Sequence, residues 1–177
     1  MRALVVVALF SVTSLSAQAQ ALDHQPSQNK YSIVHLPPTA FPELPKSVAE
    51  ELNRRGCGIP QPYPDQRVNV IRGEFSNPGQ TDWAVLCSVN RFSSILVFWN
   101  GSARDPAEVA KWPEPENAIY DSFIRPVNRK FILSHYRAYG GPKPPPIDHQ
   151  GIESGGEKAS EVLYFYRGEW LKLQGAD

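Results

Sequence analysis

The strongest constraint on the fold comes from two apolar segments, 82–89 and 94–99, which lie close together in the sequence. In both segments apolar residues occupy odd and even positions alike, so a strand formed here would have no fully polar face. Short apolar runs of this kind are typical of strands that are covered on both faces. The intervening pair Asn90-Arg91 suits a short turn. We therefore expect two neighbouring strands in the interior of a sheet.

The other predicted elements are short, because 17 prolines and 12 glycines interrupt the chain. This composition favours short strands and loops over a helical bundle. Val68 and Val70 alternate with polar or charged neighbours, as in a strand with one polar face. Further strands are expected at about 118–124, 130–138, 160–166 and 169–173. The last two are separated by Arg167-Gly168, which suits a tight hairpin turn.

One helix is predicted over residues 44–56. Its apolar residues Leu44, Val48 and Leu52 fall on a single helical face, which suits packing against a sheet. Gly56 suits the end of this helix, because glycine adopts the backbone conformation that commonly follows a helix.

A second short helix is a candidate over residues 105–110, with Asp105 as its cap and Pro106 in its first turn. Together these elements predict a mainly β protein of the α+β class. We expect an antiparallel sheet or sandwich that carries one N-terminal helix and this second candidate helix.

The N-terminal residues predict a cleavable secretory signal. A positive start at Met1-Arg2 precedes the apolar stretch 3–10 and a small-residue tract that ends at Ala19. The apolar stretch is shorter than the roughly 20 residues that span a bilayer, so we expect no membrane anchor. Cleavage after Ala19 or after Ala21 would place the mature protein in the periplasm or outside the cell.

Removal of residues 1–19 would leave an extended arm at 20–40 and a single globular domain at 41–177. The 18 basic and 18 acidic side chains balance, so the charge gives no indication of nucleic-acid binding. Cys57 and Cys87 are the only cysteines, and in an oxidising compartment we expect them to form a disulfide. No motif for a cofactor or a metal site occurs, so neither is expected.

Residues 73–86 read Gly-Glu-Phe-Ser-Asn-Pro-Gly-Gln-Thr-Asp-Trp-Ala-Val-Leu and resemble the opening of an FG-GAP or VCBS-type repeat. The resemblance extends over 73–101 and occurs once. Such repeats bind calcium through oxygen ligands at alternate loop positions, which here correspond to Glu74, Ser76, Pro78 and Asp82. Two of these four are carboxylates and Pro78 supplies no ligand, so the resemblance implies a degenerate loop. We expect the loop to keep its shape without calcium, with Asp82 accepting hydrogen bonds from loop amides.

The chain as a whole also resembles exported bacterial proteins in which a helix and a cysteine precede such a loop. In these proteins a terminal Gly-Ala-Asp, as at 175–177, closes the sheet. This resemblance implies export and no particular activity.

The longest irregular stretch, 140–158, contains five prolines or glycines in its first six residues and is expected to be a loop. Functional groups are often carried on such loops. The candidate binding residues on it are Asp148, His149, Glu153 and Lys158. His135 is expected elsewhere, as a packed residue on the strand 130–138.

No arrangement of residues typical of a catalytic site occurs, so we name no catalytic residue and expect a binding or structural module of the cell envelope rather than an enzyme. Its partner would be a protein or a glycan of the envelope. The alternative is a hydrolase of an envelope polymer that uses Asp148, His149 or Glu153. In a competing interpretation, Asp148 only bonds backbone amides in a turn and His149 is merely exposed.

The signal prediction is tested by the mass of the natively exported protein. We expect a mature chain that begins at Gln20 or at Leu22, because signal peptidase cleaves after small residues. An intact mass that still contains residues 1–19 would contradict the prediction.

Overall fold

The computed structural model describes residues 33–63, 66–115, 121–156 and 158–176, all within one unit of the chain, Tyr31–Asp177. The predicted signal at 1–19 lies outside the described residues. The described part of the predicted arm, 33–40, forms strand β1 (Val34–Leu36) and a short 3-10 helix, η1 (Pro38–Ala40). Within the described ranges, no helix is long and apolar enough to span a membrane.

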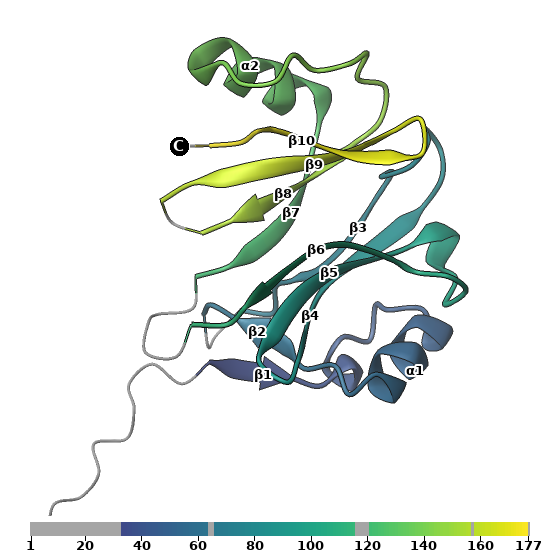
Figure 1. Ribbon diagram of the computed structural model, residues 1–177. Coiled ribbons are helices and arrows are strands. Elements are labelled where there is room, and N and C mark those ends of the chain that lie inside the picture. The colour runs from purple at the N-terminus through teal and green to yellow at the C-terminus, as the bar shows by residue number, and fades with distance from the viewer. Residues whose placement is uncertain (1–32, 64–65, 116–120, 157, 177) are drawn as a thin grey trace, which may run out of the picture. The chain divides into compact units, whose positions relative to one another are not determined.

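Two four-stranded antiparallel sheets form most of the fold (Figure 1). The strands of the first sheet, in spatial order, are β3 (Val70–Gly73), β4 (Asp82–Val89), β5 (Phe92–Phe98) and β6 (Ala107–Pro113). Those of the second are β7 (Phe123–Val127), β8 (Gly151–Gly155), β9 (Ser160–Tyr166) and β10 (Glu169–Gln174). Strand β1 pairs with β2 (Ile59–Gln61) in a small separate sheet. The predicted mainly β, antiparallel fold is therefore confirmed.

The two large sheets pack face to face. Side chains from β4 and β5, including Leu86 and Ile95, meet side chains from the second sheet, including Ile124, Ile152 and Leu163, in one buried cluster. Alternate residues point to opposite faces of a strand, so the other residues of β4 and β5 project from the outer face of the first sheet. Both strands are therefore buried on both faces, as their sequences predict.

A helix covers part of each outer face (Figure 1). Helix α1 (Lys46–Arg54) buries Val48 and Leu52 against the first sheet. Helix α2 (Arg129–Tyr139) buries Ile132 against the second sheet. The described chain thus forms four layers in the order helix, sheet, sheet, helix.

The end of α1 and the two predicted hairpin turns follow the sequence closely. Gly56 has a φ of +71°, and the amides of Gly56 and Cys57 donate to the carbonyl oxygens of Asn53 and Leu52. This pair of bonds is a Schellman motif, which satisfies carbonyl groups left free at a helix end. The turns between β4 and β5 and between β9 and β10 have positive φ at both central residues, as two-residue hairpins with right-handed strand twist require: Asn90, Arg91, Arg167 and Gly168.

Two predictions of secondary structure are wrong. The candidate helix at 105–110 is the start of β6, because Asp105 has a φ of +49° and the chain after it pairs with the free edge of β5. The strand expected at 130–138 is α2. Asn128 caps this helix by accepting a hydrogen bond from the Phe131 amide. Asparagine at this place is a signal for the start of a helix, but the apolar composition of the segment led to the prediction of a strand. His135 therefore lies on a helix, where its ring stacks on Phe131 at a centroid distance of 3.8 Å.

The expected loop at 140–158 is also partly wrong, because β8 occupies residues 151–155 and pairs with β7 and β9. The glycines at the two ends of this strand and the polar residues between them obscure the strand pattern in the sequence. The strand expected at about 118–124 is displaced along the chain. Its described counterpart is β7, and residues 118–120 lie outside the described residues.

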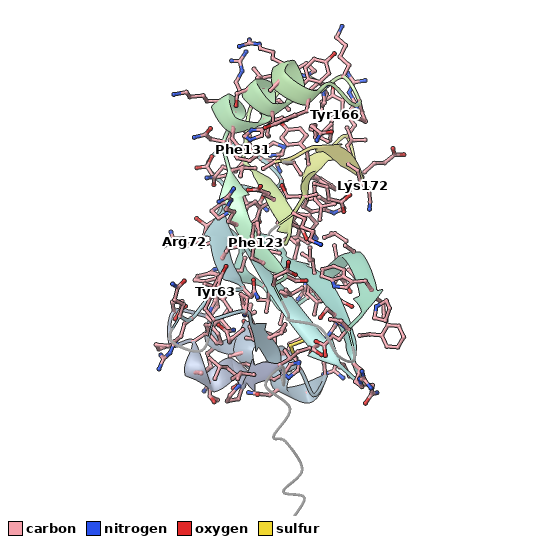
Figure 2. All side chains as sticks on the ribbon, turned by 90° about the vertical axis from the view of Figure 1, so that its left-hand side faces the viewer. Tyr63, Arg72, Phe123, Phe131, Tyr166 and Lys172 are labelled. Atoms are coloured by element: carbon pink, nitrogen blue, oxygen red, sulfur yellow. A yellow bond between two sulfur atoms is a disulfide. The ribbon has the colours of Figure 1, made fainter. Side chains whose placement is uncertain are left out.

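Cys57 and Cys87 form the expected disulfide (Figure 2). Their Cα atoms are 5.4 Å apart, a distance that a disulfide spans without backbone movement. The bond ties the chain just after α1 to the middle of β4. It therefore fixes the end of the helix on the outer face of the first sheet.

Asn69, just before β3, connects three parts of the fold although it is fully buried. Its Nδ2 donates to the carbonyl oxygens of Pro60, at 2.7 Å, and of Ser122, at 3.2 Å. Its Oδ1 accepts a hydrogen bond from the Ile124 amide at 3.0 Å, and its own carbonyl accepts one from Leu86. One side chain thus joins β2 and the edge of the first sheet to the edge of the second.

We expect Asn69→Ala to lower the free energy of unfolding by about 3 kcal/mol or more, because it leaves buried main-chain groups without partners. The matched control is Asn90→Ala. Asn90 also has a positive φ, of +50°, but its side chain is exposed in the hairpin turn, so we expect a loss of only about 1 kcal/mol. Urea unfolding of both variants measures the difference, and equal losses would contradict the role of the Asn69 side chain.

Candidate functional site

The degenerate loop at 73–82 is organised by the Asp82 carboxylate, which is fully buried. One oxygen accepts hydrogen bonds from the Phe75 amide and from the amide and hydroxyl of Ser76, at 2.8 to 3.1 Å. The other accepts from the Gln80 side chain at 2.7 Å and from the Asn100 amide at 2.8 Å. As expected, loop amides donate to Asp82. The carboxylate replaces its lost hydration with five hydrogen bonds from protein donors.

Of the other loop positions named by the resemblance, Ser76 donates to Asp82, whereas Glu74 and Pro78 make no described hydrogen bond with it. Two hydrogen bonds of 2.9 Å join Glu74 and Gln150. The Gln150 amide donates to the main-chain carbonyl of Glu74, and the Glu74 amide donates to the side-chain oxygen of Gln150. These bonds join the degenerate loop to the segment before β8. Within the part of the chain that the structure describes, no group of three His, Cys, Asp or Glu side chains could hold a metal ion.

The structure separates the four predicted binding residues into two pairs. Asp148 and His149 precede β8, whereas Glu153 lies within β8 and Lys158 follows it. The first pair lines a groove of about 290 Å³ with the degenerate loop and the β9–β10 turn. The second pair lines a different pocket, which lies on the face of the second sheet that α2 packs against. We call the first site the loop groove; it is formed by residues 76–78, 148–149 and 165–168.

Asp148 is available to a ligand, and His149 is a structural residue. The Asp148 side chain is 69% exposed, whereas the His149 side chain is 5% exposed. Both ring nitrogens of His149 lie 2.9 Å from main-chain carbonyl oxygens, those of Gln150 and Phe165. The ring also stacks on Tyr164 at a centroid distance of 4.4 Å. His149 therefore fixes the segment before β8 onto β9.

Tyr164 fixes the backbone and carboxylate of Asp148. Its hydroxyl accepts a hydrogen bond from the Asp148 amide at 3.2 Å and donates one to the Asp148 carboxylate at 3.1 Å. Burial raises the pKa of the Tyr164 hydroxyl, and the neighbouring Asp148 carboxylate adds to this effect. The hydroxyl therefore remains a hydrogen-bond donor at neutral pH and holds the exposed carboxylate in one place.

Glu153 belongs to a structural network on the outer face of the second sheet. Its side chain is fully buried, forms an ion pair with Arg125 and accepts a hydrogen bond from the Ser160 hydroxyl at 2.6 Å. The Ser160 hydroxyl also accepts a hydrogen bond from the Ala176 amide at 2.7 Å. This network ties the C-terminal residues to β8 and β9. Lys158, the fourth predicted residue, is exposed at the rim of this pocket.

Sequence reasoning missed the contribution of the β9–β10 turn to the loop groove. Arg167 is exposed at this turn, and its guanidinium lies 5.2 Å from the centre of the Tyr166 ring. Asn77 faces the same groove from the degenerate loop. The available signal was the positive φ expected at Arg167 in the hairpin turn. That signal places the residue at a loop tip but does not show which other loop it meets.

Comparison with protein-family models, with curated proteins and with solved structures finds no match to this chain. The interpretation of the loop groove therefore depends on its geometry and chemistry.

We expect the degenerate loop to be stable without calcium, and Asp82 to be its main support. Asp82→Ala should lower the free energy of unfolding by about 3 kcal/mol or more, because it leaves buried donors unpaired. Glu74→Ala is the matched control at the other carboxylate of the loop and should change stability much less. Thermal melts with calcium or with chelator should coincide. A calcium-dependent rise in melting temperature that is lost in Asp82→Ala would contradict this view.

Proposed function

We propose that the protein is an exported binding module of the cell envelope, and that it recognises a polar protein or glycan partner through the loop groove. The observation that carries the proposal is the convergence of three segments on one groove: the degenerate loop, the segment before β8 and the β9–β10 turn. These segments are far apart in the sequence. Loops held by a rigid sheet are a common place for binding residues.

The chemistry of the groove supports a polar partner. Asp148 and Arg167 supply exposed charges of opposite sign, and Asn77 supplies an amide that both donates and accepts hydrogen bonds. Phe165 and Tyr166 add aromatic surface beside these groups. Aromatic surface next to a few fixed polar groups suits a hydroxyl-rich or amide-rich ligand.

The groove is also held in shape before any ligand arrives. His149 and Tyr164 fix Asp148, the Asp82 network fixes residues 76–78, and the Glu74–Gln150 bonds join the two loops. A site that is ordered in advance loses less conformational entropy on binding. This order favours recognition by the free protein without a large rearrangement.

Hydrolysis of an envelope polymer is the less favoured alternative. A general base must offer a free proton acceptor to the reacting group. Both nitrogens of His149 face main-chain carbonyl oxygens, and Glu153 is committed to Arg125 and Ser160. Asp148 is exposed, but it has no second carboxylate or free imidazole beside it among the groove residues. These commitments favour binding over catalysis.

The proposal predicts that the double variant Asp148→Asn and Arg167→Gln loses binding to isolated cell envelope of the producing organism. We expect at least a fivefold loss in co-sedimentation, because both exposed charges of the groove are removed. The matched control is Lys46→Gln with Glu50→Gln, an exposed ion pair on α1 with a separation of 3.8 Å. The control should bind like the unaltered protein.

Treatment of the envelope identifies the class of partner. Loss of binding after periodate oxidation indicates a glycan, and loss after protease digestion indicates a protein. Unchanged binding of the double variant would show that the loop groove is not the recognition surface.

A further inference from the structure

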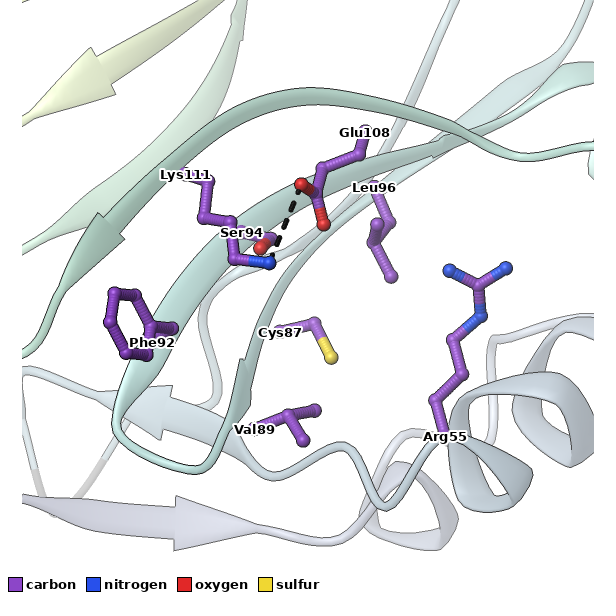
Figure 3. A pocket seen from close by; sticks show the side chains of 8 residues that line it. All are labelled: Arg55, Cys87, Val89, Phe92, Ser94, Leu96, Glu108 and Lys111. Atoms are coloured by element: carbon purple, nitrogen blue, oxygen red, sulfur yellow. Dashed lines mark ion pairs between the residues drawn. The ribbon is translucent and has the colours of Figure 1, made fainter.

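A second pocket lies on the outer face of the first sheet, beside the C-terminal end of α1 (Figure 3). Its volume is about 260 Å³, and it shares no described residue with the loop groove. We call it the disulfide pocket; its lining includes Arg55, Cys87, Phe92, Leu96, Glu108 and Lys111. The proposed envelope-binding function does not use this pocket.

The floor of the disulfide pocket is an apolar patch on β4 and β5 that is interrupted by the Ser94 hydroxyl. Cys87 pairs with Ser94 and Val89 pairs with Phe92 across the two strands, so all four side chains share one face of the sheet. Helix α1 covers the neighbouring part of this face but leaves the patch open. Phe92 stands at the edge of the pocket with 47% of its surface exposed.

A β-bulge brings a charged residue to this apolar patch. The register of β6 on β5 shifts between Ile95 and Leu96, so that Ile95 faces Ala110 and Leu96 faces Glu108. The extra residue, Val109, packs into the core between the sheets. Without the shift, alternation would send the Glu108 side chain toward that core. Bulges are frequent beside functional sites, where they redirect a side chain.

The redirected Glu108 lies next to Lys111, with 3.7 Å between its Oε1 and the lysine Nζ, as Figure 3 shows. Both side chains are about half exposed, so their attraction is weak. This pair forms one rim of the pocket, and Arg55 rises from the end of α1 as the opposite rim (Figure 3).

Arg55 has hydrogen-bonding capacity to spare. Its Nε donates to the Glu51 carboxylate at 2.7 Å, and Arg54 donates two bonds to the same carboxylate. Hydrogen bonds from Arg54 and Arg55 lower the pKa of Glu51 to about 2, so one permanent negative charge is shared by two arginines. The terminal nitrogens of Arg55 have no hydrogen-bond partner among the described residues, and Figure 3 shows the guanidinium at the side of the pocket. The rim therefore carries excess positive charge.

The disulfide holds this cation over the apolar floor. Cys57 is two residues after Arg55 and is bonded to Cys87 in the floor. The Schellman motif at Gly56 fixes the backbone between them. The disulfide therefore fixes the backbone of Arg55 beside the apolar patch, and the Nε bond to Glu51 restrains its side chain.

From this arrangement we propose that the disulfide pocket binds a small amphiphilic carboxylate. The ligand carboxylate accepts hydrogen bonds from the terminal nitrogens of Arg55, whose planar fork matches a carboxylate. The apolar part of the ligand lies over Phe92, Leu96 and the disulfide. A neutral apolar ligand gains nothing from Arg55, and a carboxylate without an apolar part gains nothing from the floor.

The test is an NMR titration of the purified, oxidised protein with 3-phenylpropionate. Two matched compounds separate the contributions: 3-phenyl-1-propanol has the apolar part alone, and acetate has the charge alone. We expect saturable shifts of amides in β4 and β5 with 3-phenylpropionate, and at least tenfold weaker binding of the other two compounds. Equal affinity of the acid and the alcohol would overturn the proposal.

Three variants then test which charged residues affect the binding of the ligand carboxylate. Arg55→Gln should weaken the binding of 3-phenylpropionate at least tenfold and leave the binding of the alcohol unchanged. Glu108→Gln should strengthen it severalfold, because it removes a like charge and frees Lys111. Arg137→Gln is the matched control, since this arginine is exposed on α2 and does not line the pocket, and it should stay within about twofold of the unaltered protein.

The outcomes are decisive in either direction. A loss in Arg55→Gln together with a gain in Glu108→Gln supports the proposal. Equal losses in Arg137→Gln and Arg55→Gln, or no change in Glu108→Gln, overturn it. Because the Glu108 variant is expected to bind more tightly, a failure to fold cannot imitate the expected result. These measurements do not involve the loop groove, so they are independent of the proposed envelope binding.

Discussion

The burial of β4 and β5 on both faces is the constraint on which the rest of the fold depends. A pair of strands without a polar face must be covered from two sides to remove its apolar side chains from water. The second sheet covers one side through residues such as Ile152 and Leu163. Helix α1 covers the other side through Val48 and Leu52. The layered arrangement follows from this requirement, and α2 repeats the solution on the second sheet.

Hydrophobic burial alone does not fix how the layers are aligned, because it is not directional. Two fully buried polar side chains supply that direction. Asn69 bonds main-chain groups at the facing edges of the two sheets, and Asp82 gathers the β3–β4 loop and the chain after β5 around one carboxylate. A buried polar group without its partners is destabilising, so each network tolerates few alternative positions of the surrounding chain. The Asp82 network also holds one wall of the loop groove in place.

The two proposed binding sites differ in chemistry because one is formed by loops and the other by an uncovered part of a sheet face. The loop groove is built from loops that are held by polar contacts, and its exposed groups are mainly polar or charged. The disulfide pocket remains where α1 stops short of covering the sheet, and its floor is apolar. On the outer face of the second sheet, the Arg125–Glu153–Ser160 network instead holds the C-terminal residues against β8 and β9.

The sequence by itself determined the features that depend on local patterns. The apolar runs predicted β4 and β5, the spacing of Val48 and Leu52 predicted α1, and the turn pairs predicted both hairpins. The cysteine count predicted the disulfide. These features follow from periodicity, backbone preference and the pairing of two thiols, all of which can be read within short stretches of chain.

Only the tertiary structure decided which distant residues meet. Apolar composition suggested a strand at 130–138, but the Asn128 cap and the packing of Ile132 on the second sheet favour α2. Glu153, expected to be available on a loop, is buried in β8, and Arg167 joins Asp148 instead. The physical reason is that hydrogen-bond partners and strand neighbours come from segments far apart in the sequence. Local propensities are weak compared with the burial and pairing free energies that these distant segments supply.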